Sequence, residues 1–256
     1  MQNHGPIQFA AVEACVDKII EKVGRRIVLG LPLGLGKPCH IANALYQRAK
    51  ADPSIHLTIF SALHIERPVP GNDLEKRFLG PILDRTFGDY PGFDYMPDLR
   101  ANKLPPNFTV SEFFLTPGKF IHNAAAQQNY ISTNYTHAVR DLNGLGVNVL
   151  AQMVSEKELA GKTWYSLSSN PDLTLDLIAL IRERERQGEK VAIVAQINNN
   201  LPFMYHDAMV DPFEFDMVVE NPAYAFTLPA PPNVPVSTTD HMIGLLSSTL
   251  IKDGGT

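Results

Sequence analysis

The chain has 256 residues, of which 45% are hydrophobic and 19% are charged, so it can bury a large core and belongs to the soluble globular class. A net charge of −5 and a pI near 5.9 argue against non-specific binding to nucleic acid. No apolar run reaches the roughly 18 residues that a membrane span requires. We therefore expect neither nucleic acid nor a membrane as a partner.

The amino-terminal sequence MQNHGPIQFAAVEACVDKII lacks the basic leader and long apolar core of a signal peptide. The two cysteines, Cys15 and Cys39, have no disulfide or metal-ligand spacing, which predicts reduced thiols in a cytoplasmic protein. Cys39 falls in the first turn of a predicted helix, where a thiolate is favoured, but we expect a buried, unreactive thiol.

The first predicted elements form a strand–helix–strand unit after an amino-terminal helix. Residues 6–23 carry a helical apolar stripe that Gly24 closes. Residues 27–29 predict a short strand, Pro38 opens a helix that ends at 52–53, and HLTIFSAL at 56–63 predicts a buried second strand. Two strands joined by one helix predict a parallel, right-handed crossover.

Residues 67–117 are rich in proline and aromatic residues and lack a clear period. We expect one or two short helices over 73–87 and a packed irregular excursion over 90–107. Residues 110–115 fit a strand or a helical turn equally well. An irregular segment of this length usually shapes a site or an interface.

The second half of the chain again alternates between helices and strands. Helices are predicted at 124–131, 134–142, 173–187 and 239–251, strands at 146–154, 163–167, 191–197 and 215–220, and a proline-rich connector at 221–235. Near-continuous apolar strands are typical of a sheet that is covered on both faces. The sequence thus predicts a single α/β domain over 1–256, with a mostly parallel sheet and helices on both faces.

A glycine-rich turn, GLPLGLGKP at 30–38, follows the first strand. Cys39 and Leu31 occupy positions where the dinucleotide and phosphate-loop fingerprints need glycine, so neither motif is present. Gly34 and Gly36 would let the backbone approach an anion or acyl group, and the helix that starts at Pro38 would offer its amides. Lys37 would add a movable positive charge. The alternative is an ordinary tight turn.

A second candidate turn, AQINNNLP at 195–202, follows a predicted strand. The carboxyl ends of parallel strands are where ligands collect, so Gln196, Asn198 and Asn200 are predicted to give neutral hydrogen bonds to the same ligand region. The alternative is that these amides cap their own turn.

Other polar residues give weaker signals. In the cluster that begins at Asn134, His137 could act as an acid or base, but a structural hydrogen bond at a helix start is the stronger expectation. The histidines have no metal-ligand spacing, so no metal is predicted. Glu66, Glu112 and Asp207 fall in irregular segments and form no evident acid/base pair, so no catalytic residue is predicted in this chain.

Five stretches together resemble a known family. They are GLPLGLGKP at 30–38, NYTHAVRDLNGLGVNVLAQMVS at 134–155, YSLSSNPDLTLD at 165–176, AQINNNLP at 195–202 and DHMIGLLSSTLIKDGGT at 240–256. In this order the chain resembles the amino-terminal domain of the acetyl-CoA hydrolase/transferase family of coenzyme A transferases. It departs from the family at FMYH after Pro202 and at SEKELAGK over 155–162, which bears on acyl specificity.

The resemblance implies a mechanism divided between two similar α/β domains. A glutamate of the second domain, expected after Thr256 and absent here, attacks acyl-CoA; CoA thiolate opens the anhydride, and a carboxylate or water completes transfer or hydrolysis. Coenzyme A is then a substrate and no cofactor is bound. The implied partners are acyl-CoA, a small carboxylate such as acetate, the carboxy-terminal domain and a possible second copy in a homodimer. The fragment alone is expected to be inactive.

Two other readings remain open at this point. The chain could be a stand-alone module that binds phosphate or a nucleotide through the glycine turn without catalysis. It could also be an enzyme like the sugar-phosphate isomerases, which would need a complete acid/base set that the sequence does not reveal.

Overall fold

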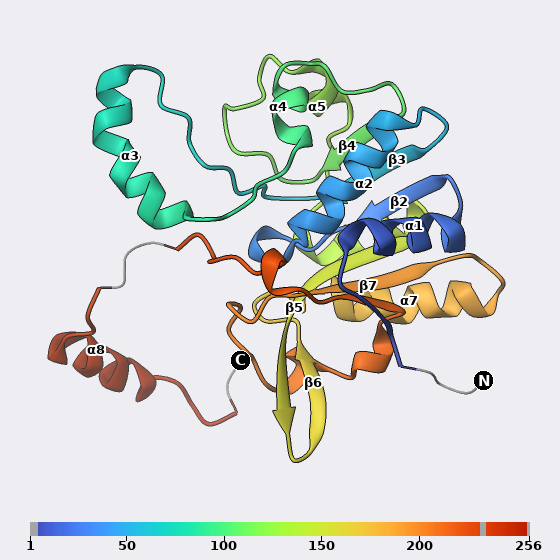
Figure 1. Cartoon of the computed structure of the whole chain (residues 1–256). Helices are drawn as coiled ribbons and strands as arrows, with labels where there is room; N and C mark the ends of the chain where they lie inside the picture. Colours follow the sequence, from blue (N-terminus) through green and yellow to red (C-terminus); the bar gives the residue numbers. More distant parts are fainter. Residues whose placement is uncertain (1–4, 231–233, 255–256) are drawn as a thin grey trace.

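The computed structural model describes residues 5–230 and 234–254. Its central sheet has the strand order β1-β9-β7-β5-β2-β3-β4, and each pair of neighbours in this order is parallel. The strands are β1 (Ile7–Phe9), β2 (Arg26–Gly30), β3 (His56–Ser61), β4 (Phe108–Glu112), β5 (Val149–Leu159), β7 (Ala192–Ile197) and β9 (Met217–Val219). The predicted α/β class with a mostly parallel sheet is confirmed (Figure 1).

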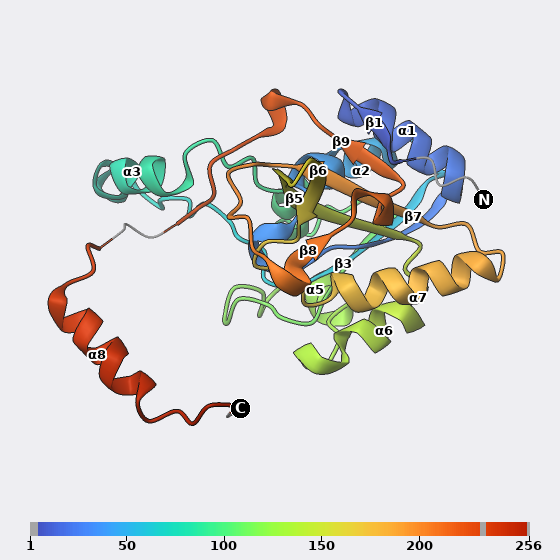
Figure 2. The ribbon, with the colours of Figure 1, turned by 90° about the horizontal axis from the view of Figure 1, so that it is seen from below.

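Helices cover both faces of this sheet (Figure 2). α1 (Val12–Val23) and α2 (Cys39–Ala51) lie on one face, whereas α6 (Ala138–Gly144) and α7 (Thr174–Arg186) lie on the other. Alternate residues of β5 divide between the two cores: Met153 packs with the α1/α2 side and Val154 with the α6/α7 side. Because both faces are buried, the strand is apolar at nearly every position.

The start and the middle of the chain differ from the predicted elements. The single helix predicted over 6–23 is wrong at its beginning, because Ile7–Phe9 forms β1 and pairs in parallel with β9. The strand predicted to end at 154 continues to Leu159 and turns into an antiparallel hairpin with β6 (Lys162–Ser166). β8 (Met209–Val210) extends that hairpin.

The segment after β3 contains more regular structure than its sequence predicts. α3 (Asp73–Phe87) is one helix despite Pro81, and the Asn72 side chain accepts a hydrogen bond from Glu75 N to cap it. α4 (Tyr95–Arg100) lies inside the predicted irregular excursion, and β4 makes residues 108–112 a strand. The remaining short elements are α5 (Ala124–Gln128), η1 (Gly34–Gly36), η2 (Tyr135–His137), η3 (His206–Ala208), η4 (Pro212–Glu214) and η5 (Pro222–Tyr224).

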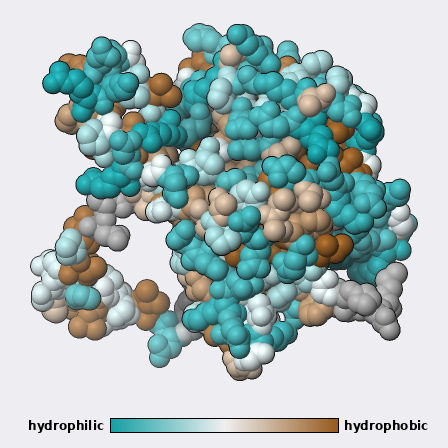
Figure 3. All heavy atoms as spheres, viewed as in Figure 1, coloured by the Kyte–Doolittle hydropathy of each residue, from teal (hydrophilic) through white to brown (hydrophobic). Residues whose placement is uncertain are grey.

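The last helix, α8 (Thr238–Ser248), lies apart from the sheet (Figures 1 and 2). Ser237 and Asp240 form a capping box at its start. Hydrophobic side chains are exposed on α8 and along α3, which Figure 3 shows as brown spheres on the same side of the molecule. Among the described residues, no helix combines the length and the hydropathy that crossing a bilayer requires.

Candidate functional site

The two predicted turns lie at the same edge of the sheet. β2 ends at Gly30 and β7 ends at Ile197, and β5 pairs with both strands. Because all three strands are parallel, the segments that follow β2 and β7 leave the sheet at its carboxyl edge. The fold thus brings the 34–38 turn and the 196–200 turn into one region.

The glycine turn forms the short 3-10 helix η1 between β2 and α2. Gly34 has a φ of +56°, a backbone conformation that is strained for a residue with a side chain. Gly36 is needed for a different reason: its N–H donates to Oδ1 of Asn170 at 2.9 Å, and a Cβ at this position would lie 2.8 Å from the same oxygen. The backbone at Gly36 therefore approaches another part of the chain, and its amide is occupied by Asn170.

Lys37 does not supply the movable surface charge that its sequence suggests. Its side chain is buried, and Nζ donates to the carbonyl oxygens of Ala62 at 2.6 Å, Leu63 at 2.9 Å and Gly34 at 3.3 Å. The prediction of a mobile cation is wrong because the end of β3 encloses the amino group. Whether Lys37 affects ligand binding stays a prediction.

His40 connects the two turns. It lies two residues after Pro38, in the first turn of α2, and its Nδ1 is 3.1 Å from Nε2 of Gln196. Gln196 is fully buried, and its Oε1 has no hydrogen-bond partner in the described structure. Oγ of Ser155 is likewise buried without a partner. Buried acceptors without partners are costly, so Oε1 of Gln196 and Oγ of Ser155 are atoms beside these turns that a further polar group would stabilise.

Asn198 and Asn200 bind the chain itself. Both side-chain amides donate to the carbonyl oxygen of Phe226, at 2.9 and 3.0 Å, and Asn200 N donates to Oδ1 of Asn198. The alternative interpretation, in which these amides cap their own turn and its neighbour, describes this conformation. Their contact with a ligand remains a prediction that would require Phe226 to move.

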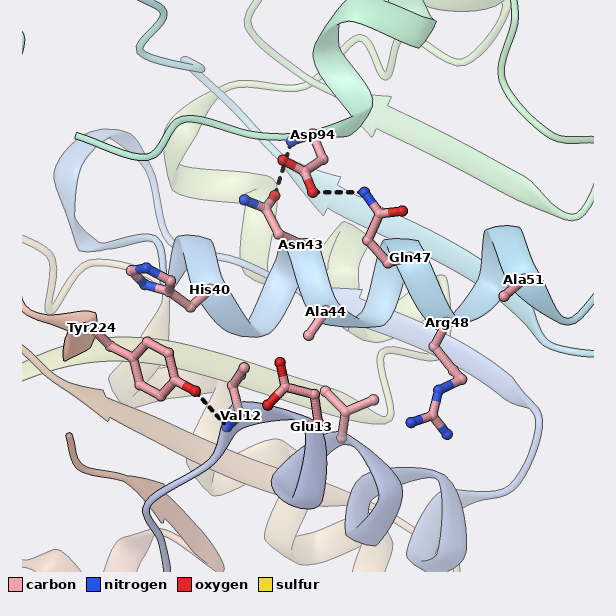
Figure 4. A pocket seen from close by; sticks show the side chains of 11 residues that line it. Val12, Glu13, His40, Asn43, Ala44, Gln47, Arg48, Ala51, Asp94 and Tyr224 are labelled. Atoms are coloured by element: carbon pink, nitrogen blue, oxygen red, sulfur yellow. Dashed lines mark hydrogen bonds between the residues drawn. The ribbon is translucent and has the colours of Figure 1, made fainter. Parts of the chain in front are cut away.

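A cavity of about 470 Å³ opens between α1 and α2 beside His40 (Figure 4). The His40 imidazole packs against two aromatic rings, with its centroid 4.9 Å from that of Tyr224 and 5.8 Å from that of Phe226. Burial lowers the pKa of His40. Tyr224 also accepts a hydrogen bond from Val12 N. His40 is therefore shared between this cavity and Gln196.

The cluster that begins at Asn134 is structural in this conformation. Asn134 Oδ1 accepts from His137 N at 3.2 Å and from Thr136 at 2.7 Å, which caps η2. The Tyr135 hydroxyl donates to Asp172. His137 is exposed, and its alternative role as an acid or base stays a prediction.

The carboxylates have different environments. Glu66 is paired with Arg100 and Asp207 is exposed in η3. Glu112 was expected in an irregular segment, but it is the buried last residue of β4. Its Oε2 lies 3.0 Å from Nδ1 of His64, so the sequence analysis missed one close carboxylate–histidine pair.

Sequence reasoning also missed His40, Asn170 and Phe226. A polar residue in the first helical turn after a glycine turn was an available signal for His40, and Asn170 belongs to the quoted stretch YSLSSNPDLTLD. Phe226 contributes a backbone carbonyl, which no residue pattern identifies.

Comparisons with known proteins identify the fold. No protein-family model and no curated protein matches the chain. Among solved structures, a single-residue mutant of RipA matches with a TM-score of 0.58 and 17% identity, over 96% of this chain and 47% of that chain. RipA from Yersinia pestis matches with a TM-score of 0.56 and 18% identity, over 97% and 49%.

A 4-hydroxybutyrate CoA-transferase from Porphyromonas gingivalis also matches, with a TM-score of 0.45 and 18% identity, over 97% of this chain and 46% of that chain. The RipA matches show a shared α/β fold. The chain spans about half the length of the RipA chains that it matches.

Proposed function

We propose that this chain is the amino-terminal half of an acyl-CoA:carboxylate CoA-transferase or an acetyl-CoA hydrolase. In this proposal it contributes the loops that hold the acyl group or carboxylate, while a glutamate in a second domain forms the glutamyl-CoA thioester. The observation that carries the proposal is the convergence of the two motif-bearing turns, 34–38 and 196–200, at the carboxyl edge of a sheet. The RipA-like fold over about half of the RipA length agrees with a two-domain protein.

Existing hydrogen bonds limit the groups that we assign to substrate binding. Pro38 has no N–H, the Gly36 amide binds Asn170, and Lys37 is buried, so the Gly34 and Leu35 amides, which belong to partly exposed residues, are the backbone donors that we assign to the developing oxyanion. The unpartnered Oε1 of Gln196 would accept from a donor on the ligand. We propose acyl-CoA and a small carboxylate as ligands, with the second domain covering the site.

A matched pair of glycine substitutions in the two-domain protein tests this assignment. Gly34→Ala and Gly146→Ala both place a side chain at a positive φ, and among the described residues only the chain neighbours lie within 4 Å of the new Cβ. Gly146 precedes β5, at the opposite edge of the sheet. We expect Gly34→Ala to lower thioester turnover at least tenfold relative to Gly146→Ala, because only the first alters the proposed oxyanion contacts. Equal turnover by the two variants would contradict the assignment of the glycine turn to the substrate site.

A further inference from the structure

Lys37 joins the glycine turn to the end of the neighbouring strand. Its Nζ reaches the carbonyls of Gly34 in the turn and of Ala62 and Leu63 after β3. Leu63 has a φ of +53°, an unfavourable conformation for a leucine, and its side chain is 41% exposed. The strained backbone at Leu63 helps to direct two successive carbonyls at one amino group.

Buried polar residues surround this contact. Glu112 ends β4 beside Ser61 in the strand register and is 4% exposed, and no residue in 5–230 or 234–254 gives its Oε1 a hydrogen bond. His64 lies between Glu112 and Tyr95: its Nδ1 is 3.0 Å from Glu112, outside hydrogen-bond geometry, and its Nε2 is 2.5 Å from the Tyr95 hydroxyl. Tyr95 is fully buried. The Glu112 carboxylate is therefore buried beside Ser61, and the next residue along β3's end, Ala62, accepts a hydrogen bond from Lys37.

Three acidic groups affect the pKa of Lys37. Burial lowers the pKa of Lys37 to about 7, and this shift is opposed first by Glu112 and then by Cys39 and Asp172. Three carbonyl acceptors match the three N–H groups of an ammonium. A charged group that is buried at this depth needs a counter-charge, and Glu112 has the largest effect of the neighbouring acids.

We propose that Lys37 is a positioning residue that fastens the glycine turn to the end of β3, and that the buried carboxylate of Glu112 is the counter-charge of its ammonium form. Lys37 then does not bind a ligand itself. It fixes the turn so that the Gly34 and Leu35 amides keep one orientation. The relevance to a ligand rests on the proposed function, whereas the fastening does not.

Three variants of this chain separate the two parts of the proposal. At pH 6, Lys37→Met leaves the Glu112 carboxylate buried without its counter-charge. Glu112→Gln likewise leaves the Lys37 ammonium buried without a counter-charge. We expect each variant to lower the denaturation midpoint, and the double variant K37M/E112Q to recover more than half of the summed loss. Hydrogen exchange measured by mass spectrometry should nevertheless be at least tenfold faster over 31–38 and 61–65 in both variants that lack Lys37.

Lys50→Met is the matched control, because Lys50 is an exposed lysine of α2 that is paired with Asp98. It should leave exchange over 31–38 unchanged. Strictly additive losses in the double variant would refute the role of Glu112. Unchanged exchange over 31–38 in Lys37→Met would refute the fastening itself.

The pH dependence of the wild-type chain tests the proposal even if the variants fail to fold. If Lys37 has a pKa of about 7 when fastened and its ordinary value when released, the released form binds more protons between pH 7 and 9. Fastening then strengthens as pH rises, so protection of the 31–38 amides, corrected for intrinsic exchange, should increase by up to tenfold per pH unit. Burial raises the pKa of Cys39 to about 12, so its thiol stays protonated over this range. A flat profile would show that burial does not lower the pKa of Lys37, which would contradict the enclosure of its amino group.

These measurements use no ligand, so their outcome is independent of the proposed reaction. If turnover never appears in the two-domain protein but the exchange and stability results hold, the proposed function fails and the fastening by Lys37 stands.

Discussion

At the scale of single residues, Gly34 and Gly36 show that one motif can need glycine for two reasons. Gly34 adopts a positive φ, whereas Gly36 is pressed against the Asn170 side chain. The sequence pattern predicted a turn that a ligand can approach, and this structure shows that Asn170 already approaches it at Gly36. Such contacts between distant segments are not encoded in local spacing, so the turn itself was predictable and its packing was not.

Replacing Gly36 by alanine should destabilise the fold. The new Cβ would lie 2.8 Å from Oδ1 and 2.9 Å from Cβ of Asn170, and such overpacking costs about 1–3 kcal/mol. Gly144→Ala at the end of α6 is the control, because no described atom outside its own helix and its chain neighbours lies within 4 Å of the added Cβ. Urea denaturation should show a lower free energy of unfolding for Gly36→Ala only, and equal values for both would contradict the packing argument.

The two cysteines should be unreactive in the folded chain. Both are buried, and burial raises the pKa of each thiol to about 12. A thiol-reactive reagent at pH 8 should modify neither cysteine before unfolding and both afterwards. Rapid modification of the native chain would show that one of them is accessible.

Because of these two thiols, we expect the free energy of unfolding to fall at high pH. Between pH 9 and 12 an unfolded thiol releases its proton while the folded thiol keeps it, so the unfolded state binds fewer protons. The free energy of unfolding should therefore fall above pH 9, by up to about 1.4 kcal/mol per pH unit for each thiol. The double variant C15A/C39A should show a smaller fall, and an unchanged slope would contradict the assignment.

At the scale of elements, the buried strands and amphipathic helices were predictable because their apolar periods are long and regular. β1 was not, because Ile7–Phe9 is too short to show a period and is a strand only through its pairing with β9. The extension of β5 to Leu159 likewise depends on pairing with β6. The mistakes fall where a partner strand, and not the local sequence, decides the conformation.

The contact between β5 and α7 gives a prediction at this scale. Thr174 at the start of α7 donates to Gln152 Oε1 in β5 at 2.8 Å, and both residues are fully buried. Thr174→Val keeps the shape but leaves that acceptor unpaired, so we expect a loss of about 1–3 kcal/mol in the free energy of unfolding. Thr163→Val on the exposed part of β6 is the matched control. Equal denaturation midpoints would show that the bond contributes nothing.

At the scale of the whole molecule, one α/β layer structure brings the two candidate turns to a single edge of the sheet. At the same edge, Gln196 and Ser155 have buried acceptors for which the described residues provide no partner, and the chain matches RipA over about half of the RipA length. The order of the motifs allowed this region to be predicted from the sequence. The enclosure of Lys37 and the hydrogen bonds from Asn198 and Asn200 to the Phe226 carbonyl could not be predicted. Both depend on which segments from elsewhere in the chain pack against this edge of the sheet.

The most direct test of the proposed function is to map covalent CoA by mass spectrometry after incubation with acetyl-CoA and acetate. The two-domain protein and this 256-residue chain would be treated identically. We predict a glutamyl-CoA adduct in the two-domain protein, on a glutamate after Thr256, and no adduct or thioester turnover by the 256-residue chain alone. An adduct within residues 1–256, turnover by this chain alone, or no adduct in either protein would contradict the account.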